Sequence, residues 1–147
     1  MRNKNDLYKT PHGVIKAWTG RLEKALHPYK GNGRVHDLGA HDGRIGRSMS
    51  KALGMDLTQI ELVRGWNYLK SRPKFLDIDR VNVAVANPPY IVAGQFMQQA
   101  IDDGFDFISM LLRVTILGSK QRVGFWNKHP MSSFYGVAPR PSFTGGK

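Results

Sequence analysis

The residues best suited to chemistry are the four that follow Ala86, which read Asn87-Pro88-Pro89-Tyr90. Neither proline has an N–H group to donate, and each restricts the residue before it, so Asn87 is held extended. An amide oxygen, backbone carbonyls open to outside donors and the aromatic face of Tyr90 together suit a planar group that carries an NH2. The alternative is an ordinary turn, because Asn-Pro and Pro-Pro are common turn dipeptides.

These residues must be positioned by the apolar run before them. Residues 81–85 are largely β-branched and have the length of a buried strand. In open parallel α/β sheets, ligands bind just beyond the carboxyl ends of the strands. The sequence therefore predicts that Asn87 lies at the tip of a parallel strand, where it would face a ligand.

A Gly-rich stretch connects a short strand, residues 35–38, to a helix that ends near Leu53. Gly39 and Gly43 allow the backbone to pass close to a ligand, and the start of the helix offers free N–H groups. Asp37 stands at the strand tip, where its negative charge would repel a phosphate. We therefore predict a ligand with a cationic end, although a turn of this kind occurs in many α/β folds.

An acid near the end of a second strand is the next candidate. Residues 59–63 read as that strand, with Glu61 near its end. In α/β domains that bind nucleosides, an acid at this position binds the ribose hydroxyls. Asp56 is the fallback for this role, and an ordinary surface acid is the other explanation.

The remaining elements follow from apolar periodicity and turn residues. Thr10 is expected to cap the first helix, with Pro11 at its first position. Residues 65–69 fit either a shortened helix or a third strand, and Phe125-Trp126 is either a buried anchor or a stacking platform. The expected helices are 11–27, 95–101 and 121–128, and further strands are expected at 105–112 and 134–137.

Length and composition limit the class of protein. The chain has 147 residues and no cysteine, which fits one domain and excludes disulfides, thiolate catalysis and cysteine-bound zinc. No apolar run is long enough to span a membrane, and residues 1–6 lack the apolar core of a secretory signal. We therefore expect a soluble, cytoplasmic protein with no membrane partner.

The charge is strongly positive and uneven. The formal net charge is +11, and no Asp or Glu follows Asp106. Such a field favours a polyanion, for which nucleic acid is the usual case, whereas a basic surface that only maintains solubility is the alternative. The basic residues expected to bind nucleic acid are Arg113, Lys120, Arg122, Lys128 and Arg140.

Strands that alternate with helices predict a doubly wound α/β sheet. With the Gly-rich turn, the acid after strand two and Asn87-Pro88-Pro89-Tyr90, the chain resembles the class I S-adenosylmethionine-dependent methyltransferases, in the branch that modifies adenine at N6. Residues 8–11 are similar to the N-terminal cofactor motif of that branch. Residues 125–130 and 140–146 are similar to small adenine methyltransferases of bacteriophages. The resemblance covers essentially the whole chain and implies one Rossmann-like, mostly parallel catalytic domain over residues 1–147.

The resemblance also implies roles for individual residues. Asn87 and Pro88 would accept hydrogen bonds from the adenine amino group, Pro89 would hold their geometry, and Tyr90 would stack on a base rotated out of the duplex. Residues 1–12 would close over the cofactor, S-adenosyl-L-methionine, and no metal is implied. The implied cofactor-binding residues are Tyr8, Thr10, Pro11, Asp37, Gly39, Ala40, Asp42, Gly43, Glu61, Phe75 and Asn87.

The chain departs from the family pattern in three places. Lys74 precedes Phe75 where the family has an acid, the segment between Glu61 and Asn87 is short, and the chain ends at Lys147 where relatives continue into a last strand. A missing last strand would leave an open sheet edge, which favours dimerisation. Residues 139–147 are expected to form a flexible basic tail.

DNA is the expected partner and substrate. An RNA base or a protein glutamine would suit the same chemistry, and a methyltransferase fold that binds cofactor or nucleic acid without turnover is the alternative from a different class. If a phage encodes the chain, its compartment would be the host cytoplasm.

Overall fold

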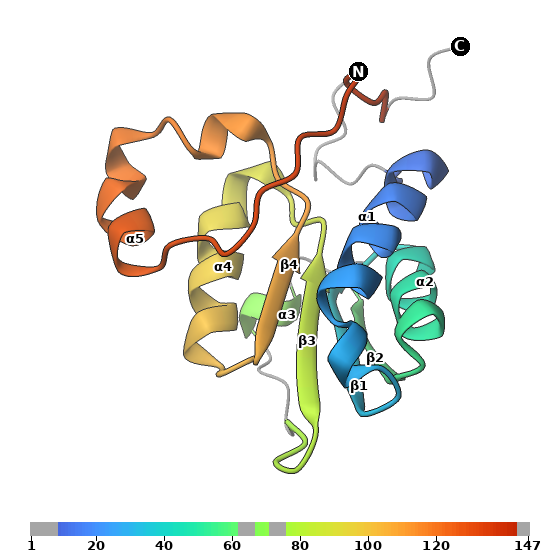
Figure 1. Cartoon of the computed structure of the whole chain (residues 1–147). Helices are drawn as coiled ribbons and strands as arrows, with labels where there is room; N and C mark the ends of the chain where they lie inside the picture. Colours follow the sequence, from blue (N-terminus) through green and yellow to red (C-terminus); the bar gives the residue numbers. More distant parts are fainter. Residues whose placement is uncertain (1–8, 62–66, 71–75, 144–147) are drawn as a thin grey trace.

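The computed structural model describes residues 9–61, 67–70 and 76–143 of the chain. Over these residues it is an α/β structure whose four strands form one parallel sheet, with helices on both faces (Figure 1). The strands are β1 (Gly33–Ala40), β2 (Asp56–Glu61), β3 (Val81–Ala86) and β4 (Phe107–Met110). The described α-helices are α1 (His12–Ala25), α2 (Arg44–Leu53), α3 (Asn67–Lys70), α4 (Ala93–Asp102) and α5 (Val123–Lys128).

The order of the strands across the sheet is β2-β1-β3-β4. The central strand β1 pairs in parallel with β2 on one side and β3 on the other, so that Asp37 aligns with both Gln59 and Val85. The chain leaves β1 through α2 towards β2, and leaves β3 through α4 towards β4. The direction of winding therefore reverses between β1 and β3, and a crevice forms at such a switch point beyond the carboxyl ends.

Helices cover both faces of the sheet. Since successive strand residues point to opposite faces, the side chains on both sides of each strand are buried. On one face, Val35, Val83 and Val85 pack against α1 and α2. On the other, Leu38 and Ala84 pack against α3 and α4. This two-sided burial explains why the strand over 81–86 is a nearly continuous apolar run rather than an alternating one.

The helix α5 packs on the outer side of α4 through a smaller cluster. Ala93, Met97 and Ile116 form its buried part, and Phe125 and Trp126 are half-buried against them. The Trp126 indole N–H also donates to the carbonyl of Ile116, at 3.4 Å. Phe125 and Trp126 are therefore anchors for α5, as one of the two interpretations predicted.

Most predicted elements are present with shifted ends. The helix α2 ends at Leu53, as predicted, and β1 is longer than predicted at both ends. The helix α4 begins at Ala93, two residues early, and β4 covers only part of 105–112. For residues 65–69 the helix alternative holds where the chain is described, since α3 starts at Asn67. Within the described residues no strand lies between β2 and β3, and residues 62–63 lie outside them.

Two local predictions are wrong. Thr10 does not cap α1: Pro11 occupies the position before the helix rather than its first turn, and no side chain caps it. The predicted strand at 134–137 is also absent, and its side chains are exposed. Apolar and aromatic residues favour a strand only where a neighbouring strand pairs with them, and none does here.

None of the described helices has the length and apolarity needed to cross a membrane.

Candidate functional site

The turn after β1 and the residues after β3 lie at the same edge of the sheet, because the two strands are parallel neighbours. Both segments stand at the carboxyl ends of their strands, on the two sides of the switch point (Figure 1). The two candidate segments named from the sequence are therefore brought together by the fold.

Asp37 holds the turn after β1 in shape. Its Oδ1 accepts a hydrogen bond from the Gly39 N–H at 3.2 Å, and its Oδ2 accepts one from the Gly46 N–H at 2.9 Å. The carboxyl group is only 1% exposed. Burial raises the pKa of Asp37 to about 6, against the opposing effect of the two N–H donors. Asp37 thus ties the strand to the first turn of α2.

Glycines make this close approach of strand and helix possible. Gly43 has a φ of 73° just before α2, a conformation that favours glycine, and a Cβ there would collide with the side chain of Arg47. A Cβ on Gly46 would lie 2.9 Å from the Cβ of Asp37. Gly46 therefore matters to the site, and sequence reasoning missed it. The sequence feature that could have indicated this role is a glycine in the first turn of a helix that follows a Gly-rich turn.

The strand β1 continues to Ala40, beyond the predicted end at residue 38. Gly39 and Ala40 are therefore strand residues rather than turn residues, and both are buried. The pairing with β2 shifts register between Asp37 and Ala40, which indicates a bulge around Gly39. The turn itself is confined to residues 41–43.

Asp42 organises that turn. Its Oδ1 accepts a hydrogen bond from the Arg44 N–H at 3.2 Å, its Oδ2 forms an ion pair with the Arg44 guanidinium at 2.8 Å, and its carbonyl accepts from Arg47 at 2.8 Å. The negative charge of Asp42 also contributes to the raised pKa of Asp37. Because Asp42 is paired with Arg44 and Arg47 lies beside it, the turn carries basic as well as acidic groups, and its charge alone does not select a ligand with a cationic end.

Asn87 immediately follows β3, as predicted, and its side-chain amide has a defined orientation. The Nδ2 group donates to the hydroxyl of Thr10 at 2.8 Å, across 77 residues of sequence. Thr10 is 5% exposed, so this contact is shielded from water. Among the described residues, none donates a hydrogen bond to Asn87 Oδ1, which leaves this oxygen to accept from a ligand.

The two prolines differ in what their carbonyls do. The Pro89 carbonyl accepts the Val92 N–H at 3.1 Å and starts the short 3-10 turn Tyr90–Val92. In the described part of the chain, no backbone N–H outside the helices and strands donates to the Pro88 carbonyl. The expectation of acceptors facing outward therefore fails for Pro89 and stands for Pro88.

Tyr90 and Arg113 meet at this edge. The Tyr90 ring is 46% exposed, and the Arg113 guanidinium lies 4.5 Å from its centroid. Arg113 follows β4, the neighbour of β3 in the sheet. The fold thus brings a predicted catalytic residue into contact with a predicted nucleic-acid-binding residue.

The other predicted nucleic-acid-binding residues are more dispersed. Arg122 lies over the first turn of α4, with its Nε 3.5 Å from the place that a Cβ of Gly94 would take. Lys120, Lys128 and Arg140 are exposed. Among the described residues, no hydrogen bond, ion pair or cation–π contact joins these three to Tyr90 or Arg113.

The two acids proposed for ribose lie at opposite ends of β2. Glu61 is the last residue of the strand and aligns with Ala40, at the candidate site. Asp56 is the first residue, and it pairs with Arg80 at 2.9 Å and Arg34 at 3.6 Å at the other edge. The fallback assignment to Asp56 is therefore wrong, because β2 begins three residues earlier than predicted.

Some predicted residues lie outside the described part of the chain. These include Tyr8, Lys74 and Phe75, as well as residues 144–147 of the predicted tail. Pro11 is described, and its carbonyl accepts the Val14 and Ile15 N–H groups at 3.1 Å, so its role is to start α1.

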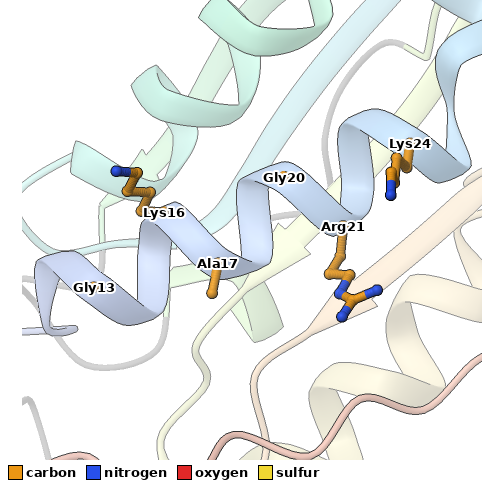
Figure 2. Close-up of a pocket in the computed structure, with 6 residues that line it drawn as sticks. All are labelled: Gly13, Lys16, Ala17, Gly20, Arg21 and Lys24. Atoms are coloured by element: carbon orange, nitrogen blue, oxygen red, sulfur yellow. The ribbon is translucent and has the colours of Figure 1, made fainter.

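A shallow hollow on the protein surface runs along α1 rather than along the carboxyl edge (Figure 2). It exists because small residues face outward on this helix, and basic side chains rim it. Its lining residues are Gly13, Lys16, Ala17, Gly20, Arg21 and Lys24. Within the described residues, no group of His, Asp and Glu side chains could hold a metal ion.

A scan of protein-family models, a search of curated proteins and a search of solved structures each found no match to this chain.

Proposed function

We propose that the protein transfers a methyl group from S-adenosylmethionine to the exocyclic amino group of adenine in nucleic acid, with DNA as the polymer. The observation that carries the proposal is the Asn87 amide at the tip of β3. Its NH2 group is engaged by Thr10, and its oxygen is left to accept a hydrogen bond at the switch point of the sheet. A substrate amine with two N–H groups is the natural partner for such an acceptor.

The chemistry follows from where the acceptors lie. Asn87 Oδ1 and the Pro88 carbonyl would each accept one N–H of the adenine amino group, which turns the nitrogen lone pair out of the plane of the base. As the new C–N bond forms, positive charge grows on this nitrogen, and the same two oxygens stabilise it. The sulfonium S–CH3 bond would break as the C–N bond forms, leaving neutral S-adenosylhomocysteine, and the extra proton on the nitrogen would then pass to water. S-adenosylmethionine, when bound, supplies a methyl group that its sulfonium has already activated.

The turn after β1 is where the cofactor would be held. Asp37 and Asp42 hold this turn in shape, and Glu61 ends its strand beside Ala40, where an acid is expected to bind a ribose. Asp37 would act mainly by shaping the turn, since its carboxyl group is buried and accepts two backbone N–H groups. The fold proposed for this arrangement is the Rossmann-like class I methyltransferase fold.

Nucleic acid is favoured over a protein substrate by charge. The described chain after Asp106 carries no acid, and Arg113 lies on the ring of Tyr90 at the proposed site. A flipped base needs an aromatic face and nearby cations for its phosphates, and this edge offers both. An RNA base or a glutamine amide would engage the same acceptors. Methylation of tRNA would indicate the RNA base, and cofactor binding without any methylated nucleoside would indicate the amide.

A second candidate function is supported by one observation. Asp37 is 1% exposed and accepts two backbone N–H groups, so the turn holds its shape without any ligand. A protein that binds nucleic acid through this edge but does not bind the cofactor would look the same. Direct measurement of S-adenosylmethionine binding by calorimetry separates the two.

The test is nucleoside mass spectrometry after incubation of the protein with S-adenosylmethionine and, in separate reactions, duplex DNA, single-stranded DNA or tRNA. We expect N6-methyladenine in one polymer, with a loss of about 10²- to 10³-fold in Asn87→Ala, the size seen when one such stabilising group is removed. The matched control is Asn127→Ala, at an exposed asparagine on α5, which should retain the wild-type rate.

The remaining outcomes are also informative. Cofactor binding without a methylated nucleoside in any polymer would redirect the proposal to a protein amide. If the cofactor does not bind at all, the enzyme proposal is wrong and the binding-only function remains.

A further inference from the structure

The contact between Arg113 and Tyr90 has a consequence beyond the proposed reaction. The guanidinium lies 4.5 Å from the ring centroid, so it covers the face of an exposed ring. A guanidinium is planar and delocalised, and it stacks on an aromatic ring in the way that a nucleobase does. Arg113 therefore occupies a place on Tyr90 that a base would need.

The charge of Arg113 has no acidic partner in the described structure. None of the ion pairs formed by described residues includes Arg113, and its side chain is exposed. A contact between a cation and an aromatic ring at an exposed site is weak, and a phosphate is a stronger, bidentate partner for arginine. The guanidinium would thus leave the ring readily when a phosphate is near.

We infer that Arg113 covers the base-stacking face of Tyr90 in the free protein and is displaced by an incoming base, after which its guanidinium pairs with a phosphate of the same strand. The inference rests on the proposed function. A base that is part of a strand brings the phosphate that compensates for the lost contact, whereas a free nucleoside brings none. Arg113 would therefore select bases within a polyanion over free nucleosides.

This arrangement predicts opposite effects of one substitution on two ligands. Arg113→Ala uncovers the ring, so an uncharged nucleoside should bind about two- to fivefold more tightly, the equivalent of one exposed cation–π contact. The same substitution removes a phosphate contact. An oligodeoxynucleotide should therefore bind more weakly, and the slope of log affinity against log salt should fall by about 0.7.

The experiment uses radiolabelled adenosine, a neutral nucleoside that carries the exocyclic amino group, and a short single-stranded oligodeoxynucleotide of adenine, with the nucleoside followed by equilibrium dialysis. Saturating S-adenosylhomocysteine closes the cofactor site to the nucleoside. Tyr90→Ala should abolish nucleoside binding. Arg21→Ala is the matched control, because it removes the same charge and a similar contact, 5.1 Å from the ring of Tyr135, and it should leave nucleoside affinity unchanged.

Tighter nucleoside binding together with weaker oligonucleotide binding in Arg113→Ala would support the inference. If Arg113→Ala binds the nucleoside no more tightly than wild type while Tyr90→Ala still loses it, the covering role is wrong and the proposed function stands. If neither wild type nor Arg113→Ala binds the nucleoside in a way that depends on Tyr90, Tyr90 is not a base platform. Both the inference and base binding at this site would then be wrong.

Discussion

Asn82 and Asn87 lie at opposite ends of the same strand, and their amides are used in opposite ways. Asn82 is 3% exposed and its side chain takes part in four hydrogen bonds within the chain. The side chain of Asn87 takes part in one among the described residues, as donor to Thr10. The asparagine amide at the amino edge of the sheet therefore has all its groups hydrogen-bonded, whereas the one at the carboxyl edge has an oxygen that can still accept a hydrogen bond.

The charges nearest the two asparagines differ in the same way, although the turn after β1 keeps an ion pair between Asp42 and Arg44. At the amino edge, Arg80 pairs with Asp56 at 2.9 Å and Arg34 pairs with Asp77 at 3.2 Å. At the carboxyl edge, Arg113 rests on an aromatic ring instead of an acid. Polar groups that satisfy one another hold a fold together, whereas polar groups with unused capacity are candidates for binding.

His36 is the exception at the amino side. Its Nε2 lies 3.1 Å from Asn82 Oδ1, but its buried Nδ1 has no partner among the described residues. Burial lowers the pKa of His36, against the opposing effect of the hydrogen bond to Asn82. Because the amide oxygen of Asn82 can only accept, Nε2 is the donor of this hydrogen bond, and Nδ1 is the nitrogen left unpaired.

The strongest test of the contrast is Asn82→Ala. It would leave the buried His36 Nε2 and half-buried backbone groups of Asp77 and Arg80 without hydrogen bonds, and we expect a loss of about 3 to 5 kcal/mol in the free energy of unfolding. Asn87→Ala, which breaks one bond at the other end of β3, should cost about 1 kcal/mol. Urea denaturation of both variants measures the difference, and equal losses would contradict the division between the two edges.

A second test measures how the free energy of unfolding depends on pH through Asp37, the buried acid at the carboxyl edge. The pKa of Asp37 is raised from 3.8 to about 6, so the folded state binds its proton more tightly than the unfolded state. Its contribution to stability is then fully present below pH 3.8 and is lost as pH rises to about 6.

Relative to Asp37→Asn, which cannot titrate, wild type should lose up to about 3 kcal/mol between pH 4 and pH 7. The pH dependence that comes from His36 is common to both proteins and cancels in this comparison. Unfolding free energies that change in parallel over this range would show that Asp37 has an ordinary pKa.

The smallest expected effect comes from a substitution that keeps Asn87 but removes the group that orients its amide. Thr10→Val removes the hydroxyl that engages Asn87 Nδ2 while filling similar space, and we expect the methylation rate constant to fall about tenfold, or about 1.4 kcal/mol. Thr10→Ser, which restores the hydroxyl, should recover most of that loss. A change in KM alone, or no recovery in Thr10→Ser, would mean that Thr10 does not orient the amide.

Local sequence was a good guide wherever neighbouring residues decide the structure. The β-branched run predicted β3 with Asn87 just beyond its tip, and the glycines around residue 43 predicted the turn into α2. Each of these depends on the backbone preferences of a few adjacent residues. Such preferences can be read without knowing what packs against them.

Tertiary structure alone decided which distant residues meet. Thr10 looked like a helix cap, but its hydroxyl engages Asn87 across 77 residues of sequence. Residues 134–137 looked like a strand and have no strand to pair with. Asp56 looked like a ribose ligand until the start of β2 placed it at the opposite edge, and Arg113 was one of five dispersed cations until β4 brought it onto Tyr90. The physical reason is that hydrogen-bond partners and strand pairing are long-range properties, which local composition does not encode.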